Sequence, residues 1–186
     1  MPIANKIAGH LSKSSWIRKM FEEGEKLRQQ HGADKVFDFT LGNPEVEPPQ
    51  SFKSALARLA NDPCVGMHRY MNNAGYQDTR AAVATRLARE SGLPVTAEHV
   101  IMTCGAGGAL NVVLKAILNQ GEEVIILAPY FVEYKFYIDN HGGVPVEVWT
   151  DKDSFRLDIN AIEQAITSKT RAIIINTPNN PTGVIY

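Results

Sequence analysis

Two uninterrupted apolar runs constrain the fold of this chain more than any other feature of its sequence. They are Val-Ile-Ile-Leu at residues 124–127 and Ala-Ile-Ile-Ile at residues 172–175. Such runs are typical of strands that are covered on both faces, as in a parallel sheet between two layers of helices. Further strand patterns at residues 99–103 and 144–149 make strands recur about every 25 residues, with helical patterns between them. The sequence therefore predicts an α/β fold, with three layers in α/β/α order and a mostly parallel sheet.

Helices are indicated by apolar residues at helical spacing and by glycines where helices should end. Gly32 and Gly92 stand where C-caps would close the helices before them. A short strand pattern at residues 36–41 leads into a segment with prolines at positions 44, 48 and 49, which favours a stiff, non-helical connector. The helices are expected near residues 16–27, 52–59, 77–90, 108–119, 132–140 and 158–167.

The proline-rich segment is the expected domain boundary. Residues 1–46 are predicted to form an N-terminal arm and the start of a small domain, and residues 47–186 the first, incomplete part of a large domain. The chain stops at Tyr186, soon after the last predicted strand, and a sheet that ended there would keep an unpaired edge. We therefore expect a fragment of a longer protein.

Composition and charge exclude several classes of protein. With 44% apolar residues among 186, the chain can bury a core and is not low-complexity disorder. Its 19 basic and 20 acidic residues give a net charge of −1 without a basic block, so neither a nucleic acid nor a membrane is indicated as a partner. The two cysteines, Cys64 and Cys104, make no disulfide framework and have no metal-ligand neighbours at useful spacing. A reduced cytoplasmic protein without a metal site is expected.

The first chemically unusual strand end is the small-residue turn Gly105-Ala106-Gly107. A strand there leads straight into a helix, and exposed N–H groups at a helix start suit a phosphate dianion. A tight turn for close strand–helix packing explains the glycines equally well. A dinucleotide fingerprint would need a glycine in place of Leu110, and the Gly-Lys-Ser/Thr of a nucleotide P-loop is absent.

Two more strand ends carry unusual residues, and ligands of open parallel sheets bind at that edge. Pro129-Tyr130-Phe131 follows the strand at residues 124–127, and an aromatic ring there could stack on a planar ligand or belong to the core. Residues 176–183 combine prolines, asparagines and a glycine after a buried strand. Prolines stiffen such a loop, and asparagine amides offer donors in fixed directions, so the loop favours a positioning role over a plain turn.

With these three segments in the order and spacing found here, the chain resembles a known enzyme family. Tyr70 five residues before Gly75, Leu-Gly-Asn-Pro at residues 41–44 and Asn-Pro-Thr-Gly at residues 180–183 complete the pattern. It is similar to the N-terminal half of class I/II aminotransferases, the aspartate-aminotransferase-like, fold-type I family of pyridoxal 5′-phosphate (PLP) enzymes. The resemblance covers residues 14–186, and it implies that residues 47–186 belong to the large PLP-binding domain.

The resemblance implies a role for each matching residue. The backbone at Gly105, Ala106 and Gly107 would hold the cofactor phosphate. Phe131 would stack on the pyridine ring, and Asn180 would donate a hydrogen bond to the cofactor's phenolic oxygen and border the substrate. The family often has a hydroxyl or lysine side chain where this chain has Gly105 or Gly107, so more of the phosphate binding is expected to fall on backbone N–H groups.

Further matches concern the partner subunit and the substrate. Tyr70 would reach the phosphate of a neighbouring subunit, which implies a homodimer with shared sites. The backbone at Gly42 would lie close to the substrate carboxylate. The family also has cis peptides before the prolines that match Pro129 and Pro181.

The implied activity is PLP-dependent transfer of an amino group between an amino acid and a 2-oxo acid. The Schiff-base lysine is expected beyond Tyr186, and no catalytic residue is expected within this chain, because the available lysines lie at unsuitable positions. A β-lyase of sulfur amino acids on the same fold and a non-catalytic, aminotransferase-like sensor domain stay open as alternatives. The lysines considered are Lys115, Lys135, Lys152 and Lys169.

Overall fold

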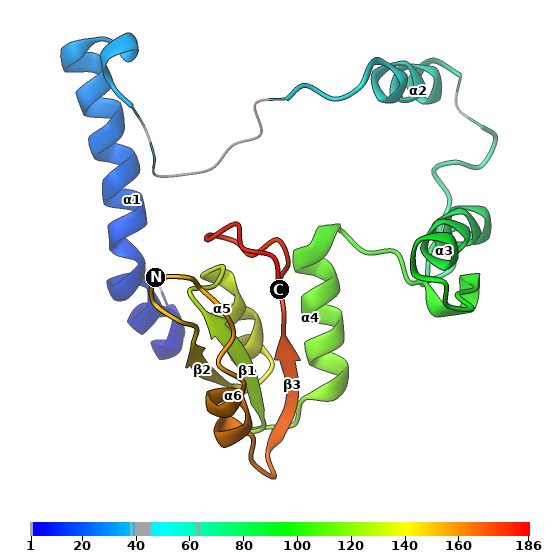
Figure 1. Ribbon diagram of the computed structural model, residues 1–186. Coiled ribbons are helices and arrows are strands. Elements are labelled where there is room, and N and C mark those ends of the chain that lie inside the picture. The colour runs from blue at the N-terminus through cyan, green and yellow to red at the C-terminus, as the bar shows by residue number, and fades with distance from the viewer. Residues whose placement is uncertain (1, 38, 40–45, 63) are drawn as a thin grey trace. The chain divides into compact units, whose positions relative to one another are not determined.

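The computed structural model describes residues 2–37, 39, 46–62 and 64–186. The chain forms two structural units, Met1–His68 and Arg69–Tyr186 (Figure 1). The division expected at residue 46 falls beside residues outside the described ranges, so it stays a prediction. No helix among the described residues combines the length and the apolar character that crossing a membrane requires.

The described residues of the first unit form helices and the segments that connect them. Helix α1 covers Asn5–His31 and ends at Gly32, whose φ of 91° and N–H bond to the Arg28 carbonyl close the helix as predicted. A 3₁₀ turn, η1, follows at Ala33–Lys35, and α2 covers Gln50–Asn61 directly after Pro49. Both α-helices extend beyond the ranges that the apolar spacing predicted, which were residues 16–27 and 52–59. In the strand predicted at residues 36–41, the described residues 36, 37 and 39 adopt no strand, and the others lie outside the described residues.

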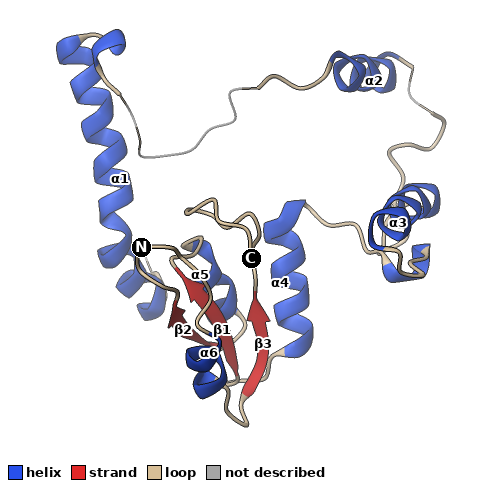
Figure 2. Cartoon of the chain, in the orientation of Figure 1, coloured by secondary structure: helices blue, strands red, loops and turns tan. Residues whose placement is uncertain are grey.

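The second unit contains the parallel sheet. Its strands are β1 at Glu123–Ala128, β2 at Val144–Trp149 and β3 at Thr170–Ile174, in the order β2-β1-β3. Figure 2 shows these strands in red and the helices of the unit in blue. These elements agree with the sequence prediction to within a few residues. The helices of this unit are α3 at Gln77–Ser91, a 3₁₀ turn η2 at Ala97–His99, α4 at Gly105–Ile117, α5 at Glu133–Asn140 and α6 at Ile159–Ala165.

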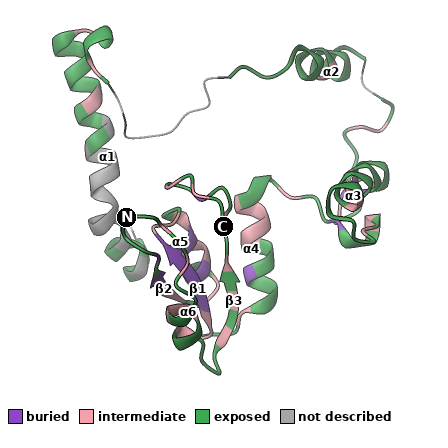
Figure 3. Cartoon of the chain, viewed as in Figure 1, coloured by how far each residue is buried: buried purple, intermediate pink, exposed green. Residues whose placement is uncertain are grey.

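Strand β1 is the centre of the core, and helices cover both of its faces (Figure 3). On one face Val124 and Ile126 pack with Leu114 of α4 and Ile138 of α5. On the other face Ile125, Leu127 of β1 and Val148 of β2 pack against α6. The three-layer α/β/α prediction is thereby confirmed, and each fully buried aliphatic side chain contributes about 1.5–3 kcal/mol.

Strand β3 differs from the expectation that both apolar runs are covered on two faces. Ala172 and Ile174 pack on the core beneath α4 and α5, whereas Ile173 is 39% exposed. The cause is position: β3 is an edge strand of this sheet, and α6 packs on β1 and β2 instead. The sequence pattern reports the apolar character of the strand but not whether a helix covers its second face.

The strand predicted at residues 99–103 is wrong. Residues 97–99 form η2, and the extended residues after it pair with no strand in the described part of the chain. Arg80 of α3 is only 8% exposed, and its guanidinium donates to the carbonyls of Val100 (2.8 Å) and Ala97 (2.6 Å). The N–H of Met102 donates to the carbonyl of Ala74. A buried side chain and a loop thus satisfy backbone groups that a sheet would otherwise use.

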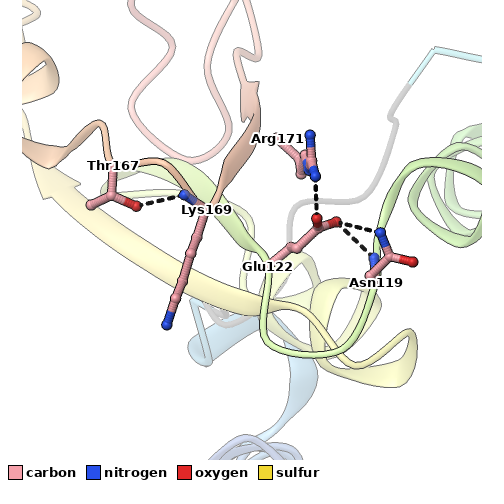
Figure 4. A network of polar contacts seen from close by, with 5 residues as sticks. All are labelled: Asn119, Glu122, Thr167, Lys169 and Arg171. Carbon is pink, nitrogen blue, oxygen red and sulfur yellow. Dashed lines mark hydrogen bonds and ion pairs between the residues drawn. The ribbon is translucent and has the colours of Figure 1, made fainter.

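A polar network joins the amino ends of β1 and β3 (Figure 4). Glu122 forms an ion pair with Arg171 and accepts hydrogen bonds from the N–H and side-chain amide of Asn119, at 2.8 and 3.3 Å. These bonds, first from Arg171 and then from Asn119, lower the pKa of Glu122 to about 2. Because the edge strand has only one neighbour, this pair adds a second connection between β3 and the segment that enters β1.

Candidate active site

The predicted cofactor-binding segments of the sheet lie at one end of it. The N-terminus of α4 and the carboxyl ends of β1 and β3 point the same way (Figure 1). The start of α4 is Gly105–Gly107, the turn after β1 contains Phe131, and the loop after β3 contains Asn180. This is the edge at which open parallel sheets bind ligands.

The glycine turn forms the first turn of α4, which begins about three residues earlier than the apolar pattern predicts. Gly105 has a φ of 69°, a left-handed conformation that favours glycine. Its N–H donates to the Thr103 carbonyl at 3.0 Å, and the Thr103 hydroxyl donates back to the Gly105 carbonyl at 3.0 Å. Cys104 at the N-cap supplies no side-chain hydrogen bond. The N–H groups that follow are therefore not capped by a side chain and can donate hydrogen bonds to an anion.

Gly107 lies against α5. A Cβ atom there would meet the Tyr137 hydroxyl at 3.0 Å. The Asn111 amide donates to the Gly107 carbonyl at 2.8 Å, and its oxygen lies 3.1 Å from Nε2 of His141. Small size at this position thus also serves close packing, as the structural explanation of the glycines requires. Tyr137, Asn111 and His141 were not found from the sequence, because helical side chains give no signal of which loop they contact.

The two aromatic residues of the turn after β1 lie in different environments. Tyr130 packs against the core, and its hydroxyl donates to Glu147 Oε2 at 2.8 Å, so the core interpretation holds for this ring. Phe131 is 37% exposed and meets Tyr134 edge to face, with ring centroids 5.6 Å apart. Phe131 therefore has ring surface available for a planar ligand. The Ala128–Pro129 peptide is cis, as the family resemblance implies.

An ion pair supports the Tyr130 side of this turn. Lys135 Nζ lies 2.6 Å from Glu147 Oε1. The hydrogen bond from Lys135 lowers the pKa of Glu147, and the same bond raises the pKa of Lys135. Partial burial raises the pKa of Tyr130. All three shifts favour the ordinary charge states at neutral pH, so Lys135 is a structural cation rather than a reactive amine.

The loop after β3 presents one asparagine and buries the next. Asn180 is exposed, and its N–H donates to Asn176 Oδ1 at 2.8 Å. Asn179 is 5% exposed, and its amide donates to the carbonyl of Pro129 and to Thr182 Oγ1, both at 3.0 Å. The Asn180–Pro181 peptide is cis, as the family resemblance implies, and Thr177–Pro178 is cis as well. Asn179 therefore joins the loop that carries Asn180 to the turn that carries Phe131.

Two predicted residues are not joined to this group. Tyr70 is fully exposed, and no contact links it to the turns after β1 and β3 in the described structure. Gly42 lies outside the described residues. The contribution of Asn179 was missed, because two adjacent asparagines look alike in a sequence and only the fold decides which is buried.

Comparison with known proteins identifies the family. The family model described as aminotransferase class I and II matches residues 34–186. The chain belongs to this family. The chain is 43% identical over 156 residues to a probable aspartate/prephenate aminotransferase of Thermus aquaticus, which covers 83% of the chain and 40% of that protein. It is 36% identical over 173 residues to aromatic-amino-acid aminotransferase 2 of Thermococcus litoralis, covering 92% and 42%.

Solved aminotransferases have the same fold. An aminotransferase of Eubacterium rectale superposes with a TM-score of 0.90 at 36% identity, over all of this chain and 48% of its own. A single mutant of the Thermus thermophilus aspartate aminotransferase superposes with a TM-score of 0.85 at 35% identity, over all of this chain and 47% of its own. The predicted family and fold are thus confirmed, and the chain spans about 40% of the length of the curated relatives described here.

Proposed function

We propose that the protein carrying this chain is a PLP-dependent aminotransferase, which moves an amino group between an amino acid and a 2-oxo acid. Family membership and the printed activities of the relatives support the reaction. The single observation that carries the proposal is the arrangement at one end of the sheet. Helix α4 begins there with an uncapped N-terminus, an exposed aromatic ring follows β1, and an exposed asparagine follows β3. Binding roles for these residues are proposals.

The donor set fits the chemistry of PLP. A phosphate dianion needs N–H donors without a competing side chain, and the first turn of α4 after Cys104 offers them. A pyridine ring needs an apolar face, which Phe131 provides in part. A phenolic oxygen needs a neutral donor that stabilises its ionised form, and the Asn180 amide has this character.

When bound, PLP supplies an electron sink that makes loss of a proton from the substrate Cα feasible. The residues of this chain would bind and orient. The N–H groups at Gly105–Gly107 would anchor the phosphate, and Phe131 would fix the plane of the ring and exclude water from one face. Asn180 would donate a hydrogen bond from its side-chain amide to the phenolic oxygen. None of these residues moves a proton at the reacting carbon, so that role is assigned to a lysine outside this chain.

The four lysines considered in the sequence analysis are unsuited to that role. Lys135 is held by Glu147, and Lys115, Lys152 and Lys169 are exposed. An exposed lysine lacks the desolvated surroundings that activate an amine as a nucleophile.

We also propose a homodimer with shared sites and a cytoplasmic location. A fully exposed tyrosine leaves its apolar ring in contact with water, so insertion of Tyr70 into a partner subunit would be stabilised by burial of that ring. Cys64 and Cys104 are free and exposed, which suits a reducing compartment. Light scattering of the full-length protein tests the dimer, and Tyr70→Phe with Tyr76→Phe as the control tests the role of the Tyr70 hydroxyl in cofactor affinity.

The activity is tested on the full-length protein. We expect a visible absorption band that borohydride abolishes, and transfer of the amino group from aspartate or an aromatic amino acid to a 2-oxo acid, the donors to which the relatives' names point. Products are identified by mass spectrometry. A colourless protein that gains no band with added PLP contradicts the proposal, and release of pyruvate and ammonia without an acceptor assigns the lyase reaction instead.

A further inference from the structure

We propose that Asn179 is a positioning residue, which locks the turn that carries Phe131 to the loop that carries Asn180. The proposal rests on the function proposed above for its meaning in cofactor binding, because it assigns how the two cofactor-facing groups keep their spacing. Asn179 itself would touch neither cofactor nor substrate.

Four hydrogen bonds of Asn179 support this role. Its backbone N–H donates to the Val184 carbonyl at 2.8 Å, and its carbonyl accepts from Gly183 at 2.7 Å, so its backbone is fixed within its own loop. Its side-chain amide has two protons, and these bind Thr182 Oγ1 and the Pro129 carbonyl. The side chain is thus held on its own loop while it reaches across to the other.

The acceptor on the other side suits such a connection. A proline has a carbonyl but no N–H, so Pro129 offers only an acceptor to the loop after β3. In the described part of the chain, no other hydrogen bond joins residues 129–131 to residues 179–184. Because a buried amide that loses its acceptor pays a desolvation cost, the connection is favoured over a separated state.

One bond can therefore fix two groups. Phe131 is two residues after Pro129, and Asn180 is the residue after Asn179. The Tyr130 hydroxyl holds the same turn on Glu147 of β2, so the turn is held from the sheet on one side and from the loop after β3 on the other. Without the Asn179 side chain, the loop would lose its bond to Thr182 Oγ1, and the turn and the loop would lose the hydrogen bond that joins them.

Hydrogen exchange of the full-length protein tests the connection without PLP chemistry. The Tyr134 amide, which donates to the Phe131 carbonyl at 3.0 Å, reports on the turn, and the Gly183 amide reports on the loop. We expect Asn179→Ala to raise the exchange rate of both amides by about fivefold, the effect of one net hydrogen bond. Thr182→Val is the matched control, because it removes the bonds that Thr182 Oγ1 accepts within the loop from Asn179 and from the Val184 N–H, and it should raise only the Gly183 rate.

The second readout is the cofactor. Asn179→Ala should weaken PLP binding by about fivefold and shift the pH midpoint of its absorbance, whereas Thr182→Val should leave that midpoint in place. An unchanged Tyr134 rate in Asn179→Ala overturns the proposal. If that variant does not fold, the wild-type protein decides: Tyr134 and Gly183 should share one opening free energy across a denaturant series, and separate values overturn it. A wild-type protein that binds no PLP refutes the proposed function and leaves the exchange result standing.

Discussion

Replacing Gly105 by alanine tests whether the turn at α4 is a phosphate-binding turn or only a packing turn. At a φ of 69° an alanine costs about 1–2 kcal/mol of backbone strain. The added Cβ would meet nothing within 4 Å, so strain is the whole cost in the folded state. Stiffening of the unfolded chain by the alanine offsets about 0.4–1 kcal/mol of that cost. We expect the free energy of unfolding to fall by about 1 kcal/mol.

Gly121 offers a matched control for this change. It has a φ of 79°, and a Cβ there would also meet nothing within 4 Å. Gly121 precedes β1, at the other end of the sheet from the candidate site, so Gly121→Ala should cost a similar free energy of unfolding. If α4 binds phosphate through its first turn, only Gly105→Ala should also weaken PLP binding, because relief of the strain would move the N–H groups of that turn.

Two measurements on the full-length protein decide the matter. Urea denaturation gives the two stability losses, and titration with PLP gives the two dissociation constants. We expect an affinity loss of about tenfold for Gly105→Ala, which corresponds to about 1.4 kcal/mol, and less than twofold for Gly121→Ala. Equal affinities in both variants would refute the assignment of the phosphate to this turn, and unchanged stability in both would refute the strain argument.

Three further changes test the core and the polar contacts. Ile126→Ala should lower the free energy of unfolding by about 2–5 kcal/mol in urea denaturation, since this side chain is fully buried in β1. Tyr130→Phe should cost about 0.5 kcal/mol, because the lost bond goes to the partly exposed Glu147; a loss above 2 kcal/mol would contradict this reasoning. The lowered pKa of Glu122 stabilises the folded state above a pH of about 4.5, and this contribution is lost as the pH falls toward 2. Glu122→Gln should therefore flatten the acid side of a plot of stability against pH, and an unchanged slope would show that Arg171 does not hold this carboxylate in solution.

The sequence was sufficient for the elements that carry their own periodicity. Strands β1 and β2 and the end of α3 at Gly92 lie within about one residue of their predicted positions, because apolar runs and a positive-φ glycine are local signals. The strand predicted at residues 99–103 failed for the opposite reason. Its pattern was apolar, but whether such a segment pairs with a strand or binds Arg80 depends on a residue 20 positions away.

In the candidate site, too, some residues could be identified from the sequence and others only from the structure. Gly105, Phe131 and Asn180 could be named from the sequence because residue type and order carry the family resemblance. The bond from Asn179 to Pro129 could not, since it joins residues 50 positions apart and depends on which of two asparagines turns inward. Tyr137 against Gly107 is a further contact of this kind, made by the packing of α4 on α5.

Mutations of exposed and of buried residues in the candidate site should have different effects. The Phe131 and Asn180 side chains, which would touch a ligand, are exposed, so replacing them removes a ligand contact at little cost in stability. Groups that set their spacing are buried and hydrogen-bonded, so replacing them affects stability and ligand geometry together. Asn180→Ala and Asn179→Ala are neighbours that separate the two cases: the first should shift the cofactor absorbance with an unchanged midpoint in urea, whereas the second should shift both. If Asn180→Ala lowered the urea midpoint as much as Asn179→Ala, the exposed asparagine would be part of the scaffold and the reasoning that assigns it to the ligand would be wrong.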